Sequence, residues 1–458
     1  MKTIYTLVLA WLMCACGQNF LNLEPISEAN VANFYQNASD FNTAVVGAYG
    51  ALQTYPDMYF ELTSYRSDEL TVGAPTAGSQ DRYNNDHFLD DASNQLQLSV
   101  WANLYNGIAR CNEIISRLNT VNLDASVKQP FDGETRFLRA YHYYNLINFW
   151  GDVPLVLQPV SVEESYQIGR SSVAAVQEAI EADLTLAIQS LPASYTGVNV
   201  GRATAGSART LLAKVQLMQK RYADVATTLQ PLLTGPYQLL SDVSQVFNVA
   251  NKYNAEIIFA VRYNKEVTNE GHGLWLTTTA ATSSLVPPWI LAAYPTGDRR
   301  RDLVTYARSG TANVYVPNKY LDVVSATTRT AGNDFPLLRF SDVLLMYAEA
   351  LNEQSYVASG EALSILNRVR TRAGAPAYTA ATLPDQSTFR QAIYLERKLE
   401  FAYEGQRWFD LLREGSAQAQ VLAYEKITVP GYRLLYPVPS QEYLKYRNPT
   451  LFPQNPGY

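Results

Sequence analysis

The side chains that could do chemistry are aromatic rings and hydrogen-bonding groups gathered in two polar segments. A flat ring can cover the apolar C–H face of a polyhydroxylated ligand, while amides, carboxylates, guanidinium groups and imidazoles bond its rim. The candidates, in chain order, are Asp68, Arg82, Tyr83, Asn84, His87, Trp101, His272, Trp275 and Trp289. These residue types predict reversible binding of a polar oligomer.

Each candidate also has a structural interpretation. Trp289 follows two prolines and could equally anchor a packed loop, and Trp101 at the start of a helix favours a core position. The run from Arg82 to His87 could be a solvated loop. The sequence leaves these alternatives open.

Motifs for covalent chemistry are missing from the sequence. It contains no G-x-S-x-G, phosphate-loop or H-E-x-x-H motif, and His87, His142 and His272 are far apart in the chain. The 42 acidic residues include no carboxylate pair in an aromatic-lined run of its own, so a glycoside hydrolase is only a remote alternative. We therefore predict no catalytic residue, no metal ligand set and no cofactor.

The cysteines and the charge exclude further classes. Cys14, Cys16 and Cys111 are too few for a disulfide framework or a cysteine metal cluster, and Cys111 is expected to be a buried small hydrophobe. The net charge is -6 and there is no long basic run, so nucleic acid is not an expected partner.

The elements that must position the candidates are mainly helices. Residues 204–219 and 222–233 form a helical pair with small residues at the contact and Thr204 as N-cap, the layout of a tetratricopeptide-type repeat. Further helices are predicted at 31–52, 96–118, 133–149, 173–189, 341–352, 360–373 and 388–403, the last with capping-box spacing from Thr388. The prediction is a mainly α fold of about four helical hairpins.

Two long polar segments interrupt this array. Residues 71–94 and 234–337 read as inserted loops, apart from a short buried strand within 253–263. Loops of this length inside a compact protein usually carry function. We expect residues 29–458 to form a single domain, in which the loops make a binding region.

The N-terminus resembles a bacterial lipoprotein signal. Lys2 precedes an apolar run at 4–13 that is too short to span a bilayer, and the small residue Ala15 precedes Cys16. We expect residues 1–16 to be the signal with Cys16 as the lipidated residue, followed by a flexible leader at 17–28. The alternative is a plain secretory signal cut elsewhere.

Six motifs in order resemble the SusD/RagB family of nutrient-binding outer-membrane lipoproteins. They are FLNLEP (20–25), RFLRAYHYYNLINFWGDVP (136–154), DRR (298–300), LRFSDVLLMYAEALN (338–352), ERKLEFAYEGQRWFDLLR (396–413) and NPGY (455–458). The resemblance covers almost the whole chain. It implies a tetratricopeptide-like scaffold on the outer face of the outer membrane, a SusC-like TonB-dependent transporter as partner, and an oligosaccharide or polysaccharide as cargo.

Two alternatives to glycan cargo remain within this resemblance. A minority branch of the family takes peptides, and the absence of tryptophan from residues 71–94 departs from many glycan binders. A helical repeat could also serve only to dock another protein. The charged residues of the motif at 396–413 are spaced to form ion pairs or caps between helices, so we interpret them as structural.

Overall fold

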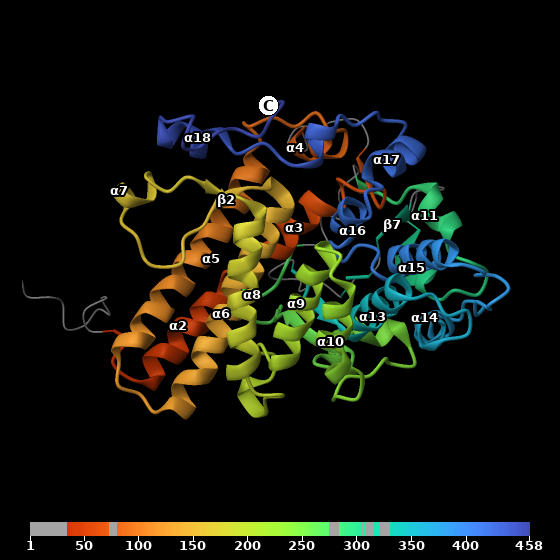
Figure 1. Cartoon of the computed structure of the whole chain (residues 1–458), viewed down its shortest axis with the longest axis horizontal. Helices are drawn as coiled ribbons and strands as arrows, with labels where there is room; N and C mark the ends of the chain where they lie inside the picture. Colours follow the sequence, from red (N-terminus) through yellow and green to blue (C-terminus); the bar gives the residue numbers. More distant parts are fainter. Residues whose placement is uncertain are drawn as a thin grey trace, which may run out of the picture.

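Stacked helices make up most of the molecule, each packed on the next (Figure 1). The computed structural model describes residues 34–72, 80–273, 284–304, 306–307, 315–317, 319–320, 322 and 330–458. Helix α5 packs on α6, α6 on α8, α8 on α9, α9 on α10, α10 on α13, and α13 on both α14 and α15. The predicted mainly α array of helical hairpins is therefore confirmed.

The array is built from long helices, and shorter ones lie around it (Figure 1). The long helices are α2 (Ala38–Gly50), α5 (Gln95–Thr120), α6 (Ala125–Trp150), α8 (Val173–Ser190), α9 (Ala205–Met218), α10 (Tyr222–Leu233), α13 (Phe340–Gln354), α14 (Glu361–Arg372) and α15 (Gln386–Glu400). The short ones are α3 (Tyr55–Thr63), α4 (Gln80–Asp86), α7 (Val162–Ser165), α11 (Pro288–Ala293), α12 (Arg300–Val304), α16 (Arg407–Glu414), α17 (Ala417–Glu425) and α18 (Ser440–Tyr446).

The strands form four antiparallel pairs in the part of the chain that is described. They are β1 (Thr71–Val72) with β5 (Ser284–Leu285), β2 (Val153–Pro154) with β3 (Arg170–Ser171), β4 (Ile257–Val261) with β8 (Phe335–Arg339), and β6 (Tyr306–Ala307) with β7 (Tyr315–Val316). Strand β4 confirms the strand predicted within 253–263. None of the helices among the described residues is long and apolar enough to cross a membrane.

Local sequence explains most helix ends. The Thr204 hydroxyl accepts a hydrogen bond from the Ser207 amide, which confirms the predicted N-cap of α9. For α15 the predicted start was wrong. Asp385 is the N-cap, and Thr388, three residues later, completes the reciprocal capping box. The carboxylate is the stronger acceptor for the free amides at a helix start, so it begins the helix before the threonine.

Two other expectations are corrected. Helix α6 begins at Ala125 and continues through Pro130, whereas the sequence predicted a helix only from residue 133, because the first turns carry no apolar stripe. Residues 71–94 are not only loop, since they contain β1 and the short helix α4. Periodicity could not identify either segment, because one is polar and the other is only two turns long.

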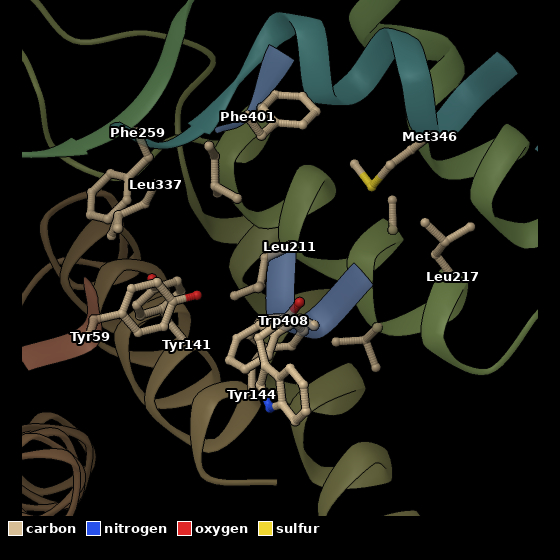
Figure 2. Packing of buried hydrophobic residues seen from close by; sticks show 14 of the residues in the cluster. Tyr59, Tyr141, Tyr144, Leu211, Leu217, Phe259, Leu337, Met346, Phe401 and Trp408 are labelled. Carbon is tan, nitrogen blue, oxygen red and sulfur yellow. The ribbon is translucent and has the colours of Figure 1, made fainter. Parts of the chain in front are cut away.

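Aromatic side chains fill the space where α3, α6 and α16 meet. Figure 2 labels Tyr59, Tyr141, Tyr144 and Trp408 in this part of the core, and all four are buried. The rings of Tyr59 and Tyr144 each lie edge-on to Phe409, with centroids 5.8 and 5.9 Å away. Much of the tyrosine of this chain therefore serves packing.

A buried ion network joins β4, β8, α14 and α15. Arg339 donates from Nη1 to Glu256 and Glu400 at 2.8 and 2.6 Å and from Nε to Glu404 at 2.7 Å. Burial alone would raise the pKa of Glu400, but the guanidinium groups of Arg372, Arg339 and Arg300 hold it well below its usual value. The structural interpretation of the motif at 396–413 is confirmed.

The end of the chain closes over the end of α6. The Asn455 amide donates to the Trp150 carbonyl at 3.0 Å and to the Tyr436 carbonyl at 2.7 Å. The Trp150 indole donates in turn to the Pro437 carbonyl at 3.0 Å. Gly151, with φ of 71°, ends the helix. The last residues thus complete a helix formed about 300 residues earlier.

His142 makes folding stability depend on pH. Its ring is fully buried against Gly107 of α5, neither ring nitrogen has a hydrogen-bond partner among the described residues, and burial lowers its pKa to about 4. The unfolded chain therefore binds the extra proton first, and stability falls as pH drops from about 6.5 toward 4.

We expect His142→Leu to remove this loss. Between pH 7 and pH 5 the wild type should lose about 2 kcal/mol of unfolding free energy relative to the variant, because only the wild type must exclude that proton. Urea denaturation of both proteins at the two pH values measures the difference. Parallel losses in the two proteins would show that His142 does not cause the pH dependence.

Candidate functional site

The two polar segments singled out in the sequence meet beside a short sheet. Thr71 pairs with Leu285 and Val72 with Ser284, which brings α4 and α11 to the same side of the molecule. The Val72 amide donates to Asp86 Oδ2 at 2.8 Å and so fixes the C-terminal end of α4. Figure 1 shows α17 near both helices.

Two stacked ring pairs line this region, and we call them the aromatic platform. The ring of Trp289 stacks on Tyr424 of α17 with centroids 5.6 Å apart and planes 26° apart. Tyr83 stacks on His87 at 3.9 Å and 20°. All four side chains are only partly buried, so they keep surface that a ligand can contact.

Local contacts hold the platform rings in place. The Trp289 indole donates to the Asp68 carbonyl at 2.9 Å, and Lys398 lies 4.4 Å from the centre of the Tyr424 ring. His87 Nδ1 lies 3.1 Å from Asp86 Oδ2, and this hydrogen bond is the main reason that the pKa of His87 is raised. The rings are therefore pre-positioned, which lowers the entropy cost of binding.

Two carboxylates beside the platform have spare acceptor oxygens. Asp86 Oδ1 and Glu425 Oε1 are buried, and neither has a hydrogen-bond partner among the described residues. Burial, with the negative charge of Asp86, raises the pKa of Glu425 to about 8, and burial also raises the pKa of Asp86. Because both oxygens are buried, they affect the charge beside the platform and have no surface for a ligand.

Two sequence candidates are fully committed to the protein interior. Asp68 is 0% exposed, and its carboxylate binds Arg407 at 2.8 Å and Lys398 at 2.7 Å. Trp101 is 4% exposed and lies edge-on to Trp150 at 5.0 Å. Asp68 therefore holds Trp289 through its carbonyl and Lys398 through its carboxylate. Trp101 is a core residue, as its structural interpretation predicted. Neither side chain has surface for a ligand.

Other candidates are tied to neighbours. Arg82 forms an ion pair with Glu61, and the Asn84 amide oxygen accepts from Gln80 at 2.8 Å. His272 is buried away from the platform, and its Nε2 lies 3.0 Å from the Asn333 carbonyl. Burial lowers the pKa of His272 to about 4, so it is neutral at physiological pH.

Trp275 and Cys16 lie outside the described residues. Sequence reasoning missed Tyr424, which belongs to the platform, and Glu425, which lies beside it. Both are more than 330 residues from Tyr83 and His87 in the chain. The only local signal was an aromatic beside an acid at the end of a short helix. In the described part of the chain no group of three or more ligating side chains could hold a metal ion.

Two family models match separate parts of the chain. The one described as SusD family matches residues 301–458, and the one described as starch-binding associating with outer membrane matches residues 19–217. SusD-like protein P25 of Formosa agariphila is 28% identical over 96% of this chain and 97% of its own length. A SusD-like protein of Bacteroides ovatus is 24% identical over 90% of this chain and 82% of its own.

Solved structures share the fold. A laminarin binding SusD-like protein has a TM-score of 0.79 at 26% identity, covering 93% of this chain and 100% of that one. Surface glycan-binding protein A of Bacteroides fluxus has a TM-score of 0.81 at 24% identity, covering 92% and 100%. The likeness in sequence and fold extends over nearly the whole chain, which belongs to the SusD family.

Proposed function

We propose that this protein binds a glycan at the outer face of the outer membrane, leaves it intact, and delivers it to a SusC-like TonB-dependent transporter. The observation that carries the proposal is the aromatic platform, whose stacked rings are only partly buried. Such rings match the apolar C–H face of a sugar. A family relative of known structure is a laminarin binding SusD-like protein, and this likeness favours a glycan over a peptide as the cargo.

The electrostatics favour binding over hydrolysis. A glycosidase sets a protonated acid against an ionised carboxylate, so the two pKa values are pushed apart. Here burial raises the pKa of both Asp86 and Glu425. Asp68 stays ionised, since Arg407 and Lys398 outweigh its burial and lower its pKa, but those cations occupy its oxygens.

The direct test is a ligand panel. Affinity electrophoresis and calorimetry against polysaccharides, with peptides alongside, should show binding of at least one glycan with a Kd of roughly 1 μM to 1 mM. Tyr83→Ala and Trp275→Ala should weaken it. Binding of peptides but of no glycan would support the peptide-binding alternative. Binding of the transporter without binding of any glycan or peptide would support the alternative that the protein is only a docking scaffold. Release of shortened sugar at a measurable turnover would contradict a non-catalytic role.

The membrane anchor has its own prediction. Cys16→Ala should give a folded protein that no longer partitions with membranes, because acyl chains on that residue supply the burial of methylenes, at about 0.8 kcal/mol each. Detergent phase partitioning compares it with the wild type, and Cys111→Ala is the matched control. If the purified Cys16→Ala variant, free of the transporter, still partitioned into the detergent phase, the assignment of Cys16 as the lipidated residue would be contradicted.

A further inference from the structure

A second concave region lies apart from the aromatic platform. It is a groove of about 680 Å³ between α2, the turn at 197–202 and the segment from Phe259 to Asn264, together with Glu270. No residue of the platform lines it. The groove is therefore a separate candidate binding site, and its lining and position indicate what binds there.

Apolar side chains stand at the groove's margins. Val46 on α2 is 55% exposed, and Val198 at the tip of the turn is 95% exposed. Of the aromatic rings that line the groove, Phe259 and Tyr263 are buried, and Tyr49 is partly buried with its hydroxyl donating to Glu134 at 2.7 Å. The exposed aliphatic margins suit the side chains of a polypeptide.

Two arginines and one glutamate line the groove, and the glutamate, Glu270, accepts a hydrogen bond from Gln53 at 2.6 Å. Arg262 donates to the Val200 carbonyl at 2.9 Å and lies 4.7 Å from the centre of the Tyr253 ring, and it forms no ion pair within the described residues. Arg202, in contrast, binds Glu134 at 2.7 Å. A carboxylate entering the groove would find its partner in Arg262.

The groove begins where the described chain begins. Tyr35, the second described residue, contacts Phe41 with ring centroids 5.2 Å apart, and Phe41 lies 6.5 Å from Phe131. Arg202, which lines the groove, lies 5.9 Å from the Phe131 ring. One continuous set of contacts thus joins the start of α2 to the groove, and the residues before Phe34 need only a short connection to reach it.

We propose that the groove receives residues 17–33 of the same chain, which are the predicted leader at 17–28 and the five residues that follow it. This leader carries Phe20, Leu21, Leu23 and Ile26 as apolar side chains, and Pro25 disfavours a helix through them. It has two acidic residues, Glu24 and Glu28, and no basic one, so its charge complements Arg262.

The length of the leader fits this arrangement. Seventeen extended residues reach about 58 Å, whereas α2 with its 13 residues is about 20 Å long. The leader can therefore follow the groove and still leave residues to reach a lipid at Cys16. Docking would hold the body at a closer and more fixed distance from the membrane than a free leader, whatever the cargo.

The test measures access to the groove in the purified full-length protein. Val46→Cys and Val198→Cys are labelled with a maleimide and read site by site by peptide mass spectrometry. Val162→Cys, which replaces a 63% exposed valine outside the groove, is the matched control. Cys111 is buried and burial raises its pKa to about 12, so it stays unreactive.

Each labelling variant is made with the natural leader and with Leu23→Asp plus Ile26→Asp. We expect the aspartates to speed labelling at positions 46 and 198 about tenfold and to leave position 162 unchanged. Equal rates with both leaders would overturn the proposal. A second result would also overturn the proposal. The cysteine at position 46 would be labelled fast with the natural leader and slowly only after an oligosaccharide or the partner transporter is added, because the groove would then bind those ligands.

Discussion

Arg339→Leu is expected to destabilise the protein by about 3–5 kcal/mol, which is a large share of the stability of a folded domain. Its guanidinium group is fully buried and binds Glu256, Glu400 and Glu404. Leucine would leave part of this negative charge unpaired in the interior, where desolvation is costly. Urea denaturation followed by circular dichroism measures the loss.

The matched control is Arg221→Leu. This residue also forms two ion pairs, with Glu181 and Asp224, but its side chain is 43% exposed. Solvent and salt screen such pairs, so the expected change is about 0–1 kcal/mol. Similar urea midpoints for the two variants would mean that burial does not set the worth of these pairs, and the account of the network would be wrong.

The second large effect concerns binding. Trp289→Ala and Tyr424→Ala should each weaken glycan binding about 10- to 100-fold, because each removes one ring of the stacked pair and loosens the other. Trp289→Phe should weaken it less, since a ring remains although the indole hydrogen bond to Asp68 is lost. Calorimetry with the glycan found in the panel gives the three affinities.

The double variant sharpens this test. If the two rings bind as one surface, removing both should cost less than the sum of the single losses. Tyr253→Ala, which removes a 38% exposed ring outside the platform, is the control and should bind like the wild type. Unchanged affinity in both single variants would show that the ligand binds elsewhere, and circular dichroism verifies that each variant is folded.

Helix periodicity predicted the scaffold well. Helix α10 has the predicted bounds, and the cap of α9 lies at Thr204, because a clear apolar stripe and a hydroxyl cap are both local signals. The start of α15 needed a choice between two capping residues, and α4 was too short for a period. Local chemistry therefore predicts the elements better than their ends.

The site was predicted only in part. Tyr83, His87 and Trp289 belong to the platform, and their role in binding stays a prediction. Asp68 was chosen for its chemistry, but the cations that bury it lie about 330 residues later. Tyr424 was missed for the same reason, because no pattern in the sequence near it indicates that it stacks on Trp289. Pairings over such separations follow from the whole fold.

The closure of α6 by Asn455 has a consequence for biosynthesis. A ribosome adds about 5–20 residues per second, so the partner of the Trp150 carbonyl is made roughly 15–60 s after the helix that needs it, 305 residues earlier. The indole of Trp150 likewise waits for Pro437. Wherever the chain folds, the end of α6 thus stays open until Pro437 and Asn455 reach it.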